Sequence, residues 1–508
     1  MLICFCTNIV AQFVKICNLK KYANCLLIVR KDSIINVKIG GFKMSLNEIL
    51  AKSKKPCKYL VEELLKKYEY VSLLGSVVTG TAIGVDTKNI SVSESANEVG
   101  YVVKIFNGKG YSEYSFDNIN EENYLELAKK IEAEITLPEL KQEHVNVGLI
   151  KEEKLKKSFC REDLSPVSDE VVVEKLTKIR DDIKNYSDLI INAIGRYNKM
   201  EVSKIFISPN KELDQYYTWT NVYAIAVSRR GNTIKMGRSV CDGANTLDVF
   251  NKMDTKINDA CQIAIELLDA KPIEPGVYDV ITDPSITGLI AHEAFGHGVE
   301  MDMFVKNRAK GKDYIGEYVA SPLIDMHDGA CATESVASYF FDDDGVLAHD
   351  TLIIKKGILQ TGISDTLSAL QLGTEPTGNG RRESYKRKAY SRMTNTFFSK
   401  GESKVSDMIK SIKHGYYLCD TNNGMEDPKN WQIQCTAEYA REIVDGKFSG
   451  KIVSPVVISG YVPDVLKSIS MVSDEFEVSG SGFCGKGHKE WVRVSDGGPH
   501  LKAKVKLG

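Results

Sequence analysis

The sequence predicts an α+β fold: an N-terminal α/β region with helices and a strand meander, followed by a mostly β C-terminal domain that carries one apolar, histidine-bearing helix. Residues 45–275 alternate helical patterns with short β-prone runs bounded by glycine or polar turns. After a proline- and glycine-rich breaker at 271–276, the pattern is mostly strand and turn. A chain of 508 residues exceeds what one hydrophobic core usually fills, so two or three domains are expected.

Residues 1–43 are predicted to be an extension upstream of the folded chain. They contain short apolar runs interrupted by lysines, and none of these runs is long enough to span a bilayer. They show neither the charge order nor a clear cleavage site of a signal peptide. Met44 then leads into Ser45–Glu48, a capping box typical of a helix start. The alternative is a membrane-associating arm.

An N-terminal α+β domain is predicted over residues 44–150. Leu60, Leu64 and Tyr68 recur at helical spacing, which predicts a helix over 45–68. Four short β-prone runs then predict a meander, and a second helical pattern follows. The strands are expected at 70–74, 80–87, 89–93 and 100–106, and the helix at 121–135.

A central helix-and-strand region is predicted over residues 151–275. Apolar residues that alternate with charges predict one long amphipathic helix over 169–200. Three strands and another helix are expected to follow, at 204–207, 216–228, 233–238 and 248–270. The breaker at 271–276 indicates a domain boundary, and a strand over 276–283 opens a β-rich domain of residues 276–508.

The composition is that of an ordinary globular protein. Hydrophobic residues make up 43% and charged residues 26% of the chain. The net charge of -2 provides no basic field for nucleic acid, and no segment predicts a membrane span. The twelve cysteines are scattered without a CxxC pair, which indicates reduced thiols and a cytoplasmic protein.

The most informative motif is His292-Glu293-Ala-Phe-Gly-His297. Two imidazoles close together with an adjacent carboxylate are typical of a metal site with a built-in base. On a regular helix, residues five apart diverge by roughly 140°, so both rings reach one ion only if a π-bulge unwinds the helix. Gly296 and Gly298 would let the backbone tolerate this distortion. The alternative is a hydrogen-bonded structural pair, but we favour a metal-binding helix.

A third ligand is needed, and the residues leave several candidates. Glu300, His327 and Cys331 are near in sequence, whereas Cys484 is distant. Cys484 is slightly favoured, because it lies in a glycine-dense turn that exposes its thiol and has Lys486 nearby to stabilise the thiolate. His488 is a further candidate ligand. The same turn nearly matches a phosphate-binding loop, but Gly487 replaces the required hydroxyl residue.

A second polar cluster, Thr377–Arg382, has two interpretations. Composition favours a solvated loop rich in turn residues. The alternative is a substrate-binding loop in which Asn379, Arg381 and Arg382 bind peptide carbonyls or a terminal carboxylate.

These segments together resemble the TldD/PmbA family of metalloproteases. The resemblance covers roughly residues 45–508, and its specific motifs all follow residue 276. They are the histidine helix with Glu300 and Asp302, then Asp342–Gly345, Thr377–Arg382, Arg392–Thr396, Cys484–Lys486 and Gly498–His500. Several rare motifs in one order make the match specific. Residues 1–43 have no counterpart in it, and His488 stands where glutamine is expected.

The resemblance implies a zinc ion held by His292, His297 and Cys484, with Glu293 as general base. It implies a zinc-bearing, TldD-type member that hydrolyses small or unfolded peptides, either as a homodimer or with a TldE/PmbA-type partner that lacks the metal motif. Two alternatives stay open: a non-catalytic scaffold subunit of a peptidase complex, and a zinc hydrolase of a non-peptide substrate.

Overall fold

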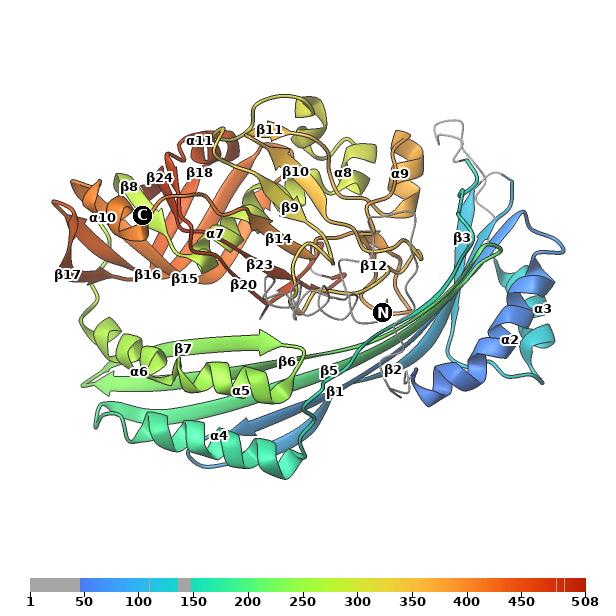
Figure 1. Cartoon of the computed structure of the whole chain (residues 1–508), viewed down its shortest axis with the longest axis horizontal. Coiled ribbons are helices and arrows are strands. Elements are labelled where there is room, and N and C mark those ends of the chain that lie inside the picture. The colour runs from blue at the N-terminus through green and yellow to red at the C-terminus, as the bar shows by residue number, and fades with distance from the viewer. Residues whose placement is uncertain (1–45, 109, 136–147, 481, 488) are drawn as a thin grey trace, which may run out of the picture. The chain divides into compact units, whose positions relative to one another are not determined.

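The computed structural model describes residues 46–508 except 109, 136–147, 481 and 488. The predictions for residues 1–43 and for His488 therefore lie outside the described residues. The α+β fold class is confirmed, with helices and long strands mixed up to residue 275 and strands dominant afterwards (Figure 1). No helix in the described ranges is both long enough and apolar enough to cross a membrane.

One large sheet organises the first half of the described chain. Its strands are β1 Tyr70–Val85, β2 Ile90–Phe106, β3 Tyr111–Phe116, β4 Leu155–Arg161, β5 Ile190–Ile207, β6 Lys211–Arg230 and β7 Thr233–Gly243. They follow the order β3-β2-β1-β5-β6-β4, and β7 pairs with β6. The helices around it are α2 Glu48–Leu64, α3 Tyr124–Glu134, α4 Asp169–Lys184, α5 Thr246–Asp254 and α6 Ile257–Glu266.

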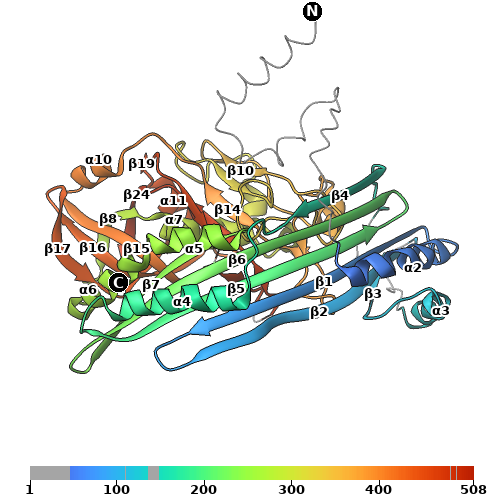
Figure 2. The same cartoon turned by 60° about the horizontal axis from the view of Figure 1, so that its bottom comes forward.

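The two faces of this sheet are buried against different partners. Successive side chains of a strand point to opposite faces, so alternate residues of β5 separate into two sets. Ala193 and Tyr197 pack with α4 and α5 in one apolar cluster. Phe206 instead packs with Phe341 from the C-terminal half of the chain. Figure 2 shows the long strands side by side with α4 beside them.

The predicted four-strand meander was wrong, because the structure has two long strands, β1 and β2, in its place. The glycines that suggested turns lie inside these strands, where close packing excludes a side chain. A Cβ on Gly100 would lie 2.1 Å from the Tyr385 ring, and one on Gly75 would lie 2.9 Å from Ile205. Glycine here provides space for a neighbour instead of marking a turn.

The predicted helix over 169–200 was also too long. α4 ends at Lys184, and residues 190–200 belong to β5, which pairs with β1 on one side and β6 on the other. Pairing on both sides overrides the weak helical pattern of this segment. Because β1 and β5 share one sheet, the predicted boundary at residue 150 falls inside a continuous structure. The predicted helix over 248–270 is divided into α5 and α6.

Two large sheets organise the C-terminal half, whose described residues also form two two-stranded sheets. The first contains β8 Gly276–Thr282, β15 His414–Asp427, β16 Gln432–Val444, β17 Lys447–Val453, β18 Val456–Tyr461 and β24 Leu501–Leu507. The second contains β9 Met326–Asp328, β10 Thr351–Lys355, β11 Ile358–Leu359, β14 Asn395–Phe398, β20 Glu477–Ser479 and β23 Ser495–Gly498. Helix α7, Pro284–Ile290, contacts β15 of the first sheet and β23 of the second, and so connects both to the histidine stretch.

Buried ion pairs join the large sheet to the C-terminal half. Lys104 of β2 forms an ion pair with Asp344 and lies 3.4 Å from Glu113. Lys204 of β5 pairs in the same way with Asp343. The Asp342–Gly345 motif therefore has a structural role here: it fixes the position of the C-terminal half on the sheet.

Replacing Lys104 by methionine is expected to lower the free energy of unfolding by about 3 kcal/mol, because Asp344 would keep a buried charge without its partner. Denaturant unfolding of both proteins measures the difference. The matched control is Lys55→Met, which removes an exposed ion pair with Glu121 and is expected to change stability far less. Equal, small effects of the two substitutions would contradict a stabilising role for the buried pair.

Candidate metal centre

The histidine stretch forms a distorted helix, as predicted. Asp283 caps its start by accepting a hydrogen bond from the backbone N–H of Ile286 at 2.7 Å, and α7 follows. Residues Ala291–Gly296 then form a π-helical turn. This turn brings His292 and His297 together, with ring centroids 5.1 Å apart. The unwinding expected from their five-residue spacing is confirmed.

The two glycines of the motif serve a different purpose from the one predicted. Gly296 has ordinary right-handed helical angles, so it does not relieve backbone strain. A Cβ on Gly296 would lie 2.0 Å from the sulfur of Met393, and one on Gly298 would lie 2.8 Å from a carboxylate oxygen of Glu426. Neighbouring side chains pack so closely against both positions that only glycine fits there.

Cys484 completes a cluster of three potential metal ligands. Its Sγ lies 3.3 Å from Nε2 of His297, and the ligand atoms of His292, His297 and Cys484 all lie within 4.8 Å of one another. The other candidates within the described residues lie elsewhere. His327 forms a hydrogen bond with Asp350, and the thiol of Cys331 contacts the carbonyl of Ala348.

The three residues stabilise one another's charged forms. Burial opposes the charged thiolate, but the positive charges of His297 and His292 outweigh it and hold the pKa of Cys484 well below its usual value. Burial likewise lowers the pKa of His292, but the negative charge of Cys484 outweighs it and raises that pKa to about 9. The thiolate is therefore stabilised by the histidines, whereas Lys486, predicted to do this, binds Glu300 and Asp302.

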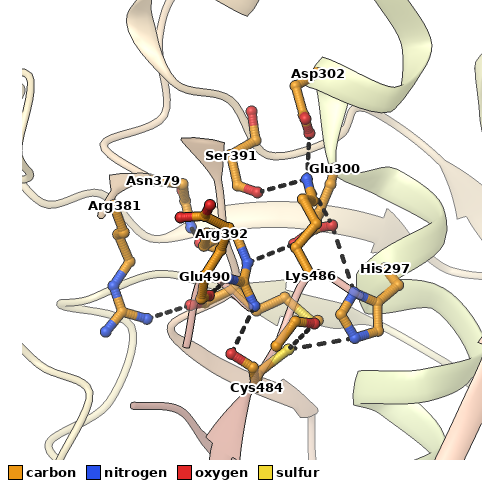
Figure 3. Close-up of polar contacts among 12 residues, drawn as sticks. His297, Glu300, Asp302, Asn379, Arg381, Ser391, Arg392, Cys484, Lys486 and Glu490 are labelled. Atoms are coloured by element: carbon orange, nitrogen blue, oxygen red, sulfur yellow. Dashed lines mark hydrogen bonds and ion pairs between the residues drawn. The ribbon is translucent and has the colours of Figure 1, made fainter. Parts of the chain in front are cut away.

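Glu300 connects His297 to two buried cations, as Figure 3 shows. Its carboxylate lies 3.4 Å from Nδ1 of His297, 3.2 Å from Nε of Arg392 and 3.1 Å from Nζ of Lys486. Burial would raise the pKa of Glu300, but the Lys486 ammonium and His297 hold it well below its usual value. Arg392 also donates a hydrogen bond to the carbonyl of Cys484 at 2.9 Å. One network thus orients both His297 and Cys484.

The residues fit a zinc ion. Two imidazoles and a thiolate match the three protein ligands of catalytic zinc sites. Nδ1 of His292 is buried and has no hydrogen-bond partner among the described residues, while the ring forms a hydrogen bond with Cys484. Glu300 contacts the ring nitrogen of His297 opposite Nε2, which is the arrangement that fixes metal-ligating histidines elsewhere.

Replacing Glu300 by glutamine is expected to weaken zinc binding roughly 10- to 100-fold, because His297 loses its anionic partner. Competition with a chromophoric chelator measures the affinity. Asp302→Asn is the matched control: Asp302 shares Lys486 with Glu300, but no contact joins it to His297. Unchanged affinity in Glu300→Gln would show that the carboxylate does not support the ligand.

A cavity of about 1170 Å³ opens over this cluster. Glu293 lies on its wall beside both histidines, and a Cβ on Gly424 would be 2.4 Å from its Cγ. Among the acidic residues that line the cavity are Glu426 and Asp496, which the sequence motifs did not identify. Burial raises the pKa of Asp496 to about 6. No local sequence signal distinguishes either residue, because each is separated from the histidine motif by more than a hundred positions.

The predicted substrate-binding residues do not line this cavity. Asn379 is fully buried and donates hydrogen bonds to Asp328 and to the carbonyl of Arg392. Arg381 donates to two backbone carbonyls, and Arg382 pairs with Glu113. These contacts lie within the fold, so they give no support to a role of the three residues in peptide binding, which stays a prediction.

The fold and the cluster define a class of protein: an α+β chain in which two histidines and a cysteine that could hold a metal ion lie beside a carboxylate. The model of the PmbA/TldA metallopeptidase C-terminal domain matches residues 275–506. A protein named metalloprotease from Methanothermobacter thermautotrophicus is 30% identical over 343 residues, which cover 67% of this chain and 74% of that relative. The chain therefore belongs to the TldD/PmbA family of metalloproteases, as its motifs predicted.

Another relative and a solved structure are also similar to this chain. A protein named zinc metalloprotease TldD homolog from Saccharolobus solfataricus is 26% identical over 430 residues, covering 82% of this chain and 91% of that protein. The crystal structure of TldE from Thermococcus kodakarensis superposes with a TM-score of 0.73 at 19% identity, covering 89% of this chain and 100% of that one. At that identity the structural likeness shows the shared fold alone.

Proposed function

We propose that this protein is a zinc-dependent metallopeptidase that hydrolyses small or unfolded peptides. The observation that carries the proposal is the convergence of His292, His297 and Cys484 beside Glu293 on the wall of a large cavity. The names of the relatives, metalloprotease and zinc metalloprotease TldD homolog, support it.

In this proposal, different residues of the chain bind the metal, transfer the proton and position a ligand. His292, His297 and Cys484 would hold the zinc, which when bound polarises a peptide carbonyl and lowers the pKa of the attacking water. Glu293 is placed to accept the proton of that water and to pass it to the leaving amine. Glu300, through its contact with Nδ1, keeps the ring of His297 in place.

The cavity supports a peptide as the substrate. Its volume of about 1170 Å³ is above the roughly 300–1,000 Å³ of pockets for small ligands. Strand β20 lies at the edge of its sheet, and its residues Glu477 and Ser479 line the cavity. An extended peptide adding to such an edge through main-chain hydrogen bonds would be bound with weak sequence preference.

The proposal is tested by incubating the zinc-loaded protein with unstructured peptides and identifying products by mass spectrometry. Cleavage that a chelator abolishes and added zinc restores is the expected result. Bound zinc without any peptide product would favour a hydrolase of another substrate. Failure to bind zinc would favour a scaffold subunit.

We also propose that the protein acts in the cytoplasm, as a homodimer or with a TldE/PmbA-type partner. The reduced-thiol composition and the family resemblance support this. Light scattering on the purified protein, alone and mixed with such a partner, measures the assembly. A monomer under both conditions would contradict it.

A further inference from the structure

Glu426 is an unusual carboxylate on the wall of the cavity. It lies near the end of β15, where it pairs with Ile433 of β16. Both of its carboxylate oxygens are buried, and neither has a hydrogen-bond partner among the described residues. Buried polar groups in proteins nearly always have partners, so an unpartnered one that faces a cavity indicates a missing ligand.

The surroundings of Glu426 form a small polar recess next to the metal centre. A Cβ on Gly298, the residue after His297, would lie 2.8 Å from Oε1 of Glu426 and 3.3 Å from Nε1 of Trp431. The glycine thus lets both groups lie close to the backbone beside His297. Nε1 of Trp431 is also buried, and it has no hydrogen-bond partner within the described ranges.

Other acidic side chains lie near Glu426. Burial, together with the charges of Glu293 and Glu300, raises the pKa of Glu426 well above its usual value, and His297 only partly opposes this. Two cationic side chains near the histidines, Lys486 and Arg392, already form ion pairs with Glu300. A cationic ligand would provide the N–H donors and the opposite charge that the carboxylate lacks.

We propose that Glu426 forms a cation-binding subsite of the peptide cavity, which takes a protonated amine or a guanidinium group of the substrate. This inference rests on the proposed peptidase function and specifies its substrate class. The cation has two possible sources, the N-terminal ammonium of the peptide or a lysine or arginine side chain. The position of the subsite beside His297 means that the bound cation lies close to the bond that is cleaved.

The test compares three peptides of one neutral sequence in the zinc-loaded protein. One has a free N-terminus, one is N-acetylated, and one is N-acetylated but carries a single lysine. We expect kcat/KM for at least one cationic peptide to exceed that for the neutral peptide by roughly 10-fold or more. A preference for the free N-terminus identifies the ammonium as the source, and a preference for lysine identifies the side chain.

Glu426→Gln is expected to bring this ratio close to one, because the side chain keeps its size but loses its charge. Asp259→Asn is the matched control. Asp259 lines the same cavity but is exposed and lies on α6, away from the proposed peptide edge, so this variant should keep the preference. A ratio that persists in Glu426→Gln would overturn the inference. So would a loss of zinc from Glu426→Gln, since it would make Glu426 a metal ligand.

Titration calorimetry separates this inference from the proposed function. The same peptides are titrated into zinc-loaded Glu293→Gln protein, with and without Glu426→Gln. Tighter binding of a cationic peptide that depends on Glu426 supports the subsite even if no peptide is cleaved. Equal affinities for all three peptides overturn the subsite even if the wild type is an active peptidase.

Discussion

Glu293→Gln is expected to reduce kcat/KM for peptide hydrolysis by roughly 10²- to 10⁴-fold, the range that a positioned general base contributes. Glutamine has nearly the same shape as glutamate but accepts no proton at neutral pH. The residue is not one of the three clustered ligands, so the zinc content should stay at the wild-type level. Peptide cleavage rates and metal analysis on the same preparation measure both quantities.

The control for this variant is Asp259→Asn, which removes an exposed carboxylate from the same cavity and should leave turnover near the wild-type rate. If Glu293→Gln kept more than a few per cent of wild-type turnover, Glu293 would not be the base. Loss of zinc from Glu293→Gln would instead show that the carboxylate supports the metal.

Cys484→Ala is expected to remove most of the bound zinc and with it the activity. Two histidines alone leave a weak site, so the loss of affinity should exceed the roughly 10- to 100-fold typical of a hydrogen-bond partner of a ligand. Cys331→Ala is the matched control, because this cysteine was an alternative third ligand yet lies outside the cluster. Zinc analysis after dialysis against a weak chelator measures the difference.

The opposite pattern would reassign the third ligand. If Cys484→Ala kept its zinc and its activity while Glu300→Ala lost both, Glu300 would be the ligand and the family-based assignment would be wrong at this position. Loss of zinc in Cys331→Ala alone would contradict the geometry of the cluster.

Much of the candidate metal site could be predicted, because the sequence features that indicate it lie within short segments. The spacing of His292 and His297 requires an unwound helix if both bind one ion, and the π-helical turn satisfies that requirement. Cys484 was identifiable because a cysteine among glycines is poor core material. Glu426 was not, since its role depends on a recess that exists only when β15 lies beside Gly298.

The errors in the fold have a common cause. Gly75 and Gly100 lie at the ends of predicted short strands, but they provide room inside long strands for side chains that lie far away in sequence. Residues 190–200 continued a helical pattern, but strand pairing on both sides decides their conformation. In each case a long-range contact overrides a local preference, and such contacts are not visible in a single sequence.

X-ray absorption spectroscopy of the purified, zinc-loaded protein tests the central claim most directly, because it identifies the atoms bound to the metal. We expect one zinc ion per chain, with one sulfur neighbour at about 2.3 Å and nitrogen or oxygen neighbours at about 2.0–2.1 Å. The sulfur signal should vanish in Cys484→Ala. A zinc ion in the wild-type protein with no sulfur neighbour, or no stoichiometric zinc at all, would contradict the site formed by His292, His297 and Cys484.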